Sequence, residues 1–138
     1  MNDLITYKVN EPLTTDEFIE VLKTSTLAER RPTNDLKCME GMVKNSNLIV
    51  SAMCGVKLIG VARSVTDFHY CCYLSDIAVD VEYQNRGIGK ELIRITRQQL
   101  GKHYKLILLS APAAVDYYPK LGFKKHPQAW YIDDDEKL

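Results

Sequence analysis

The sequence has no excess of either charge, since 18 lysine and arginine residues balance 18 aspartate and glutamate residues. Nucleic-acid-binding domains usually carry a basic excess, so this balance speaks against a nucleic-acid partner. Long apolar runs are missing as well. The longest, Leu48–Cys54 and Leu106–Leu109, fall well short of the roughly 20 residues that a membrane helix needs. The sequence therefore predicts neither a nucleic-acid partner nor a membrane partner.

An export signal and paired metal-binding cysteines are also absent. Met1–Leu4 has neither the basic start nor the apolar run of a signal peptide, so we expect a cytoplasmic protein with reduced thiols. None of the cysteines forms a Cys-x-x-Cys pair, and we expect no metal site. We interpret all four as small core residues: Cys38, Cys54, Cys71 and Cys72.

Length and periodicity favour one mixed α/β domain over residues 1–138. Thr14 and Glu17 have the spacing of a capping box at the start of a first helix, and Asn34 or Asp35 is expected to cap a second. Alternation late in the chain predicts at least one parallel β-α-β unit. The expected strands are Ile5–Val9, Leu48–Cys54, Leu58–Thr66, Cys71–Val81, Lys105–Leu109 and late segments at Phe123 and Trp130–Ile132. The later helices are expected over Ile88–Leu100, with an apolar stripe of Ile88, Leu92, Ile95 and Leu100, and over Ala113–Leu121.

One turn carries most of the functional signal. Gln84, Gly87 and Gly89 form a Gln-x-x-Gly-x-Gly pattern where a predicted strand leads into a predicted helix. Amide groups at a helix start have no partner inside the helix, and glycine lets an anion approach the backbone closely. The pattern is therefore typical of a phosphate-binding turn.

Two common nucleotide motifs do not fit this turn. A Walker loop requires glycine where Gln84 stands and serine or threonine where Glu91 stands. A Rossmann fingerprint requires glycine or alanine in the third position, which is Leu92. These mismatches disfavour a nucleotide-binding protein, which is kept as an alternative.

A second block, Ala114–Phe123, reads Ala-Val-Asp-Tyr-Tyr-Pro-Lys-Leu-Gly-Phe. Together with the glycine turn it resembles the GNAT superfamily of acetyl-CoA-dependent N-acetyltransferases. The resemblance follows the element order from the first strand to Trp130 and is most specific over residues 74–123. It implies the GNAT fold, in which a mixed and mostly antiparallel central sheet is flanked by about four helices.

The resemblance also implies acetyl-CoA as cosubstrate, with no metal. The pantetheine arm is expected to extend the sheet beside Ile77, Ala78 and Val79, with the N–H of Val79 or a neighbour on the thioester carbonyl. The pyrophosphate is expected at the turn formed by Gln84, Asn85, Arg86, Gly87, Ile88, Gly89 and Lys90. For the side chains of Arg86 and Lys90, a solvated position is an equal alternative.

Further roles follow from positions in the second block. Tyr118 aligns with the tyrosine that donates a proton to the departing thiolate, and packing in the late helix is its alternative. Tyr117 is expected in the core. Ala111 stands where many family members have an asparagine that contacts the cofactor, and whether Ser110 replaces that contact is left open.

The general base is also left open. Asp76 is expected beside the thioester, on one face with Leu74 and Ala78 if the strand alternates regularly. It either accepts the proton of the amine or, the favoured alternative, forms a structural ion pair. Ordered water could also serve, and the remaining candidates are Glu29, Glu40 and His69.

The sequence thus predicts an N-acetyltransferase that acts on a primary amine, most simply a small molecule, by direct attack in a ternary complex. Arg30 and Arg31 lie where the acceptor site is expected, and either bind an acidic group of the acceptor or lie in a solvated loop. A non-catalytic acyl-CoA-binding or regulatory module on the same fold is the alternative. A homodimer with contacts through the late strands is expected by analogy with the family.

Overall fold

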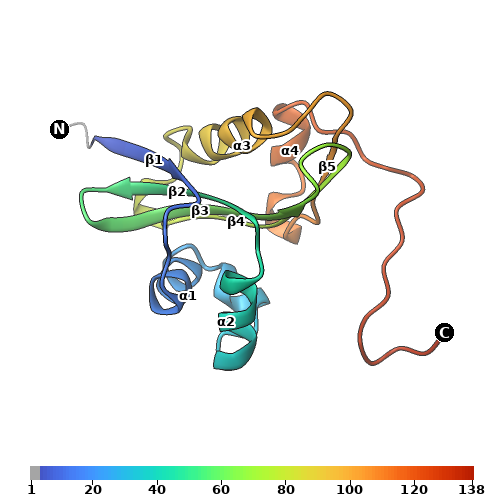
Figure 1. Ribbon diagram of the computed structural model, residues 1–138, viewed down its shortest axis with the longest axis horizontal. Helices are drawn as coiled ribbons and strands as arrows, with labels where there is room; N and C mark the ends of the chain where they lie inside the picture. Colours follow the sequence, from blue (N-terminus) through green and yellow to red (C-terminus); the bar gives the residue numbers. More distant parts are fainter. Residues whose placement is uncertain (1–3) are drawn as a thin grey trace.

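A five-stranded mixed sheet runs through the computed structural model, which describes residues 4–138 (Figure 1). The strands lie in the order of the sequence: β1 Ile5–Val9, β2 Leu48–Cys54, β3 Lys57–Thr66, β4 Cys71–Val79 and β5 Lys105–Ile107. The pairs from β1 to β4 are antiparallel, while β4 and β5 are parallel. The mixed, mostly antiparallel sheet and the late parallel unit are therefore confirmed.

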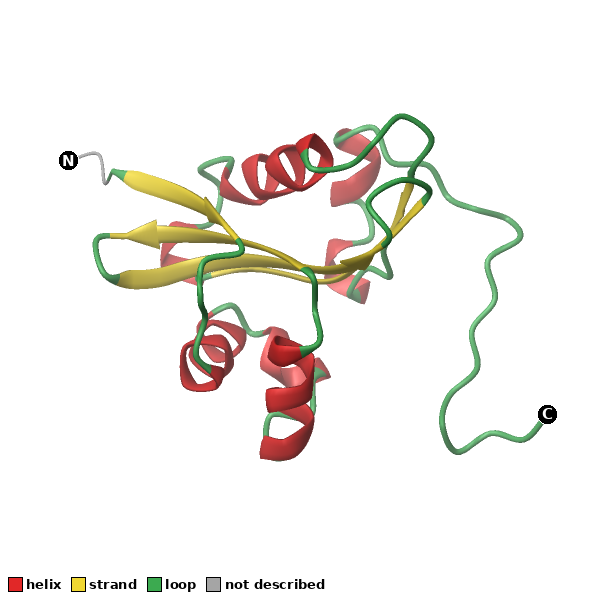
Figure 2. Cartoon of the chain, viewed as in Figure 1, coloured by secondary structure: helices red, strands yellow, loops and turns green. Residues whose placement is uncertain are grey.

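Helices cover both faces of this sheet, as Figure 2 shows. The α-helices are α1 Thr15–Thr24, α2 Leu36–Lys44, α3 Ile88–Gln98 and α4 Tyr117–Lys120, and the 3₁₀ turns are η1 Leu27–Arg30, η2 Val81–Tyr83 and η3 Pro112–Ala114. In this part of the chain, residues 4–138, no helix is long and apolar enough to cross a membrane.

The first two helices begin at side-chain caps, but α3 does not. Thr14 and Glu17 form the predicted reciprocal capping box of α1, with both hydrogen bonds at 3.1 Å. Asp35, not Asn34, caps α2 by accepting the amide of Cys38 at 3.0 Å. The N-cap of α3 is Gly87, which offers no side-chain cap.

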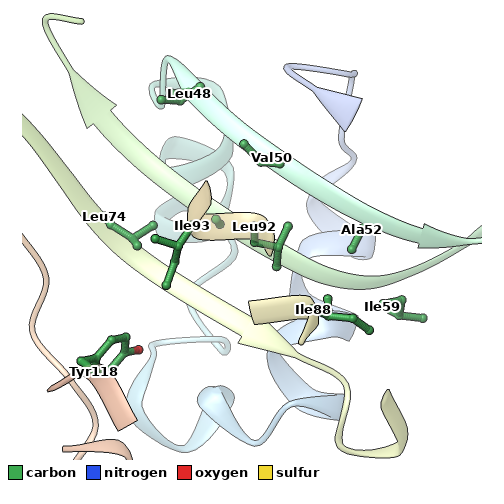
Figure 3. Packing of buried hydrophobic residues seen from close by; sticks show 10 residues of the cluster. Leu48, Val50, Ala52, Ile59, Leu74, Ile88, Leu92, Ile93 and Tyr118 are labelled. Atoms are coloured by element: carbon green, nitrogen blue, oxygen red, sulfur yellow. The ribbon is translucent and has the colours of Figure 1, made fainter. Parts of the chain in front are cut away.

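Each face of the sheet buries its own apolar cluster. Between the sheet and the helices α3 and α4 lies one cluster, which includes Leu48, Val50, Ile59 and Leu74 of the sheet, Leu92 of α3 and Tyr118 of α4, all labelled in Figure 3. Between the sheet and the helices α1 and α2 lies the other cluster, which includes Phe18 and Leu22 of α1, Met39 of α2, and Ile49 and Val61 of the sheet. The two clusters hold the sheet between two layers of helices, because each helix buries its apolar face against one face of the sheet.

The register of α3 differs slightly from the prediction. The fully buried face is Ile88, Leu92, Ile93 and Thr96, whereas Ile95 and Leu100 are only partly buried. The helix ends at Gln98, two residues before the predicted end at Leu100. Just after it, Gly101 donates its amide to the carbonyl of Phe68 at 2.8 Å, which ties the end of α3 to the loop before β4.

The prediction for the end of the chain was wrong. The expected helix over Ala113–Leu121 is divided into η3 and α4, and neither Phe123 nor Trp130–Ile132 is in a strand. Trp130 is 92% exposed, and the segment runs away from the sheet (Figure 1). Aromatic and β-branched residues favour strands only where a neighbouring strand is available for pairing and packing, and β5 is three residues long. Of the late strands expected as a dimer contact, β5 is formed, whereas the segments at Phe123 and Trp130–Ile132 are not strands.

We predict that Trp130→Ala changes the free energy of unfolding by less than about 0.5 kcal/mol, since the side chain packs on nothing. Leu92→Ala is the matched comparison, because Leu92 is fully buried and its truncation costs about 2–5 kcal/mol. Urea unfolding followed by circular dichroism measures both. A loss above about 1 kcal/mol in Trp130→Ala would mean that the C-terminal segment packs against the domain.

Candidate functional site

A cleft of about 820 Å³ opens beside β4. One wall comes from η1 and the residues just before it, the floor from β4, and the other wall from the chain after β5 up to α4. The residues that line it include Thr26, Glu29, Arg30, Arg31, Ser75, Ile77, Ala78, Val79, Gln84, Ala111 and Tyr118.

The cleft exists because β4 and β5 separate after a short ladder. Their parallel pairing covers only three positions, from Cys71 and Lys105 to Tyr73 and Ile107, while β4 continues to Val79. Just beyond this ladder β4 contains a bulge, since Asp76 pairs with Arg63 and Leu74 with Ser64, leaving Ser75 unpaired. A bulge bends its strand and increases the local twist. The second half of β4 is therefore an open edge.

The open edge of β4 presents backbone hydrogen-bonding groups to the cleft. The amide of Asp80 donates to the carbonyl of Ile59 on β3 at 2.8 Å. Successive residues of a strand direct their backbone groups to opposite edges, so Val79 and Ile77 direct theirs away from β3. The side-chain amide of Gln84 donates to the carbonyl of Val79 at 3.0 Å, which joins this edge to the following turn.

The glycine turn continues from this end of the cleft. Gln84 belongs to the cleft lining, whereas Asn85–Lys90 form the turn beyond it. Asn85 and Gly87 have φ values of +63° and +77°, and the first helical hydrogen bond of α3 runs from the amide of Glu91 to the carbonyl of Gly87 at 3.0 Å. The preceding amides therefore have no partner within the helix, and the uncapped helix start is suited to an anion.

The second motif meets the first through Tyr117. A Cβ atom at Gly89 would lie 3.2 Å from the Tyr117 hydroxyl oxygen, so glycine at this position lets the phenol approach the turn. Tyr117 is 40% exposed, and its predicted place in the core was wrong. The sequence carried no signal for this contact, because both tyrosines of the Tyr-Tyr pair are equally compatible with burial.

Tyr118 is both packed and part of the cleft. It is 9% exposed, and its ring makes edge-to-face contacts with Tyr117 and Phe123 at centroid distances of 5.3 and 5.6 Å. Figure 3 shows it beside the cluster that α3 covers. Burial, with a smaller contribution from Tyr117, raises the pKa of Tyr118 above the usual 10.0. The phenol is therefore protonated at neutral pH and can donate a proton.

Asp76 forms the ion pair that was the favoured alternative to a general base. Its side chain is fully buried, with Oδ1 accepting from Nε of Arg31 and Oδ2 from Nε of Arg63, both at 2.5 Å. The same two guanidinium groups hold the bulge: Arg31 donates to the carbonyl of Ser75 at 2.8 Å and Arg63 to its hydroxyl at 2.9 Å. Because both carboxylate oxygens are engaged, neither is directed at the cleft as a proton acceptor.

The bulge also corrects the expected face of Asp76. Leu74 belongs to the cluster under α3, whereas Ala78 belongs to the cluster under α1 and α2. Arg63, which binds Asp76, lies over the ring of Phe18 in α1 at 5.9 Å. Asp76 therefore shares a face with Ala78 but not with Leu74, because the extra residue in the bulge reverses the alternation.

Membership of the cleft lining distinguishes the remaining candidates for the general base and for the cofactor contact. Glu29 is in its lining, but Glu40 and His69 are not. Ala111 is in the lining at the start of η3, while Ser110 is not.

Among residues 4–138, the side chains close enough to share a metal ion are Asp133, Asp135 and Glu136, all exposed and outside the cleft lining.

Comparison with known proteins gives one consistent family. The model of the acetyltransferase (GNAT) domain matches residues 14–133. An uncharacterised N-acetyltransferase, ycf52, from Pyropia yezoensis is 32% identical over 107 residues, which are 70% of this chain. The matched region is 62% of that relative, so this chain spans less than two thirds of its length.

Solved structures share the fold over nearly the whole chain. A GNAT-family acetyltransferase from Streptococcus pneumoniae TIGR4 has a TM-score of 0.71 and 20% identity, covering 96% of this chain and 100% of that one. An aminoglycoside N-acetyltransferase in complex with CoA, AAC(6')-Iy, has a TM-score of 0.72 and 15% identity, covering 98% and 97%. At these identities the likeness shows the fold.

We predict that Asp76→Asn lowers the free energy of unfolding by about 3–5 kcal/mol, because the buried guanidinium group of Arg63 and the partly buried one of Arg31 then face a neutral amide. Asp116→Asn is the control, since the exposed Asp116 makes no capping bond at α4. Urea midpoints of the two variants give the comparison. Equal midpoints would show that the ion pairs with Asp76 contribute nothing to the fold.

Proposed function

This chain belongs to the GNAT family of acetyltransferases, and from that premise we propose that it transfers an acetyl group from acetyl-CoA to a primary amine of a small molecule. The reaction proceeds by direct attack in a ternary complex. One observation carries the proposal: a single cleft brings together the open edge of β4 and the phenol of Tyr118, and the turn that begins α3 continues from Gln84 at one end of this cleft.

The residues of β4 and the glycine turn fit an extended chain that ends in phosphates. Ile77 and Val79 would add the amides of the pantetheine arm to the sheet, as peptides add to an exposed strand edge. The backbone amides of Gly87–Lys90 would hold the pyrophosphate. Arg86 donates to the carbonyl of Glu82 at 3.3 Å and stacks over Tyr83, so its charge is held beside the turn.

Three groups of the cleft supply what acetyl transfer needs. The backbone N–H of Val79 would donate to the oxygen of the tetrahedral intermediate. Tyr118 would protonate the departing thiolate, whose conjugate acid titrates below a buried phenol. Glu29 is the carboxylate of the cleft lining that would take the proton of the amine, directly or through water, while Asp76 holds the bulge.

Gly87→Glu is predicted to abolish acetyl-CoA binding, because it places a carboxylate where the pyrophosphate is expected. Gly55→Glu is a matched control in the turn between β2 and β3: both glycines have positive φ, at +77° and +61°, and a Cβ atom at either meets nothing within 4 Å. The two substitutions therefore introduce the same charge and similar backbone strain.

Isothermal titration calorimetry with acetyl-CoA, and with ATP and NAD as competing ligands, makes the comparison. Micromolar binding of acetyl-CoA alone by the wild type and by Gly55→Glu supports the proposal. Binding that survives in Gly87→Glu, or no binding by the folded wild type, contradicts the assignment of the turn. Binding without turnover of any amine identifies the non-catalytic acyl-CoA-binding module. Ala111 in the cleft lining is compatible with this alternative, because it stands where many family members have an asparagine that contacts the cofactor.

Tyr118→Phe is predicted to lower kcat by about 100-fold while leaving the Kd for acetyl-CoA unchanged, because only the proton donor is removed. Tyr104→Phe, which removes a phenol outside the cleft lining, should leave both constants unchanged. Steady-state rates and calorimetry measure the two effects. An unaltered kcat in Tyr118→Phe would exclude Tyr118 as the proton donor.

A further inference from the structure

A largely buried cluster beside the cleft carries one net positive charge. It consists of one carboxylate, Asp76, between two guanidinium groups, Arg31 and Arg63, whose side chains are 21% and 8% exposed. The other bonds of the two guanidinium groups go to neutral oxygens of Arg30, Ser46 and Ser75. Within residues 4–138, Asp76 is the one acidic group paired with either of them.

An uncompensated charge in this position makes an anion a favourable neighbour. Removing a charge from water is costly unless an opposite charge or hydrogen bonds replace the water. The ring face of Phe18, 5.9 Å from Arg63, compensates only weakly. The excess positive charge of the cluster is therefore available to a ligand.

Arg31 is the member of the cluster that reaches the cleft. It lies in the cleft lining at the end of η1, whereas Arg63 does not. A guanidinium group has five N–H donors, and the bonds to Asp76, Arg30 and Ser75 use one on each nitrogen. Arg31 therefore keeps N–H donors for a planar anion such as a carboxylate, or for a phosphate.

The same wall has two further features of a ligand site. Thr26 begins η1 with φ of +71°, an unfavourable angle for a β-branched residue, and strain of this kind gathers at functional sites. Glu29 places a negative charge in the lining close in sequence to the positive charge of Arg31. The wall is thus complementary to a molecule that carries both a cation and an anion.

We infer that the acceptor is an amine that also carries an anionic group, a carboxylate or a phosphate, and that Arg31 binds this group while the amine faces the open edge of β4. This inference rests on the proposed function. It names the class of acceptor and a specificity-determining residue for it.

The variant Arg31→Gln tests the role of this side chain without leaving a buried charge unpaired. Removing the guanidinium group of Arg31 leaves Asp76 and Arg63 as a neutral pair, so we expect the fold to be retained. A thermal melt of the variant checks this. Arg31→Lys, which keeps the charge but loses the planar fork, is the second variant if Arg31→Gln does not fold. Arg97→Gln removes an exposed positive charge outside the cleft lining and serves as the control.

Matched acceptors measure the preference. O-phosphoethanolamine is compared with ethanolamine, and β-alanine with propylamine, at saturating acetyl-CoA. We expect kcat/KM to be roughly 10- to 100-fold higher for one or both anionic amines in the wild type and in Arg97→Gln, and this preference to disappear in Arg31→Gln. Which pair shows it distinguishes a phosphate from a carboxylate. Equal rates within both pairs, or a preference that Arg31→Gln retains, would overturn the inference.

A binding measurement decides the case in which no amine of the panel reacts. With CoA saturating the glycine turn, inorganic phosphate and acetate are titrated into the wild type and the variants and followed by NMR chemical shifts. Millimolar binding of either anion that Arg31→Gln loses supports the subsite. Binding unchanged in Arg31→Gln, binding lost in Arg30→Gln instead, or no binding contradicts it. Failure to bind CoA is a separate result, which refutes the proposed function.

Discussion

The unpaired residue in β4 is the constraint on which the site depends. Ser75 has no partner on β3, so the strand bends at the point where its ladder with β5 ends. Two guanidinium groups, from Arg31 and Arg63, hold both the backbone carbonyl and the hydroxyl of this residue. The bend and the end of this ladder lie next to each other, and the edge of β4 at Ile77 and Val79 is open to the cleft.

The cluster around Asp76 joins three parts of the chain that are far apart in sequence. Arg31 follows η1, Arg63 lies in the middle of β3, and Asp76 follows the bulge of β4. Because each carboxylate oxygen is bound by a different guanidinium group, the segment that follows η1 is fixed to the sheet at the same point where the sheet opens. The excess of one positive charge is the electrostatic consequence of this joint, and it faces the cleft through Arg31.

Local sequence signals predicted the features of the structure that depend on neighbouring residues. The capping box of Thr14 and Glu17 formed as expected, and the family resemblance through the glycine turn led to the correct fold. The predictions that failed needed long-range partners. Asp76 was placed on the face of Leu74 because alternation assumes an uninterrupted strand, and Trp130 was placed in the sheet because its neighbours favour strands.

The sequence by itself determined the order of helices and strands from β1 to β5, the capping box that begins α1, and the glycine turn that begins α3. These features rest on backbone geometry and side-chain chemistry within a few residues. Only the tertiary structure decided that Asp76 is an ion-pair centre, that Tyr117 meets Gly89, and that Arg31 reaches the cleft. These contacts join distant segments of the chain, and the bulge that allows them shifts the register by one residue, which hydrophobic periodicity does not report.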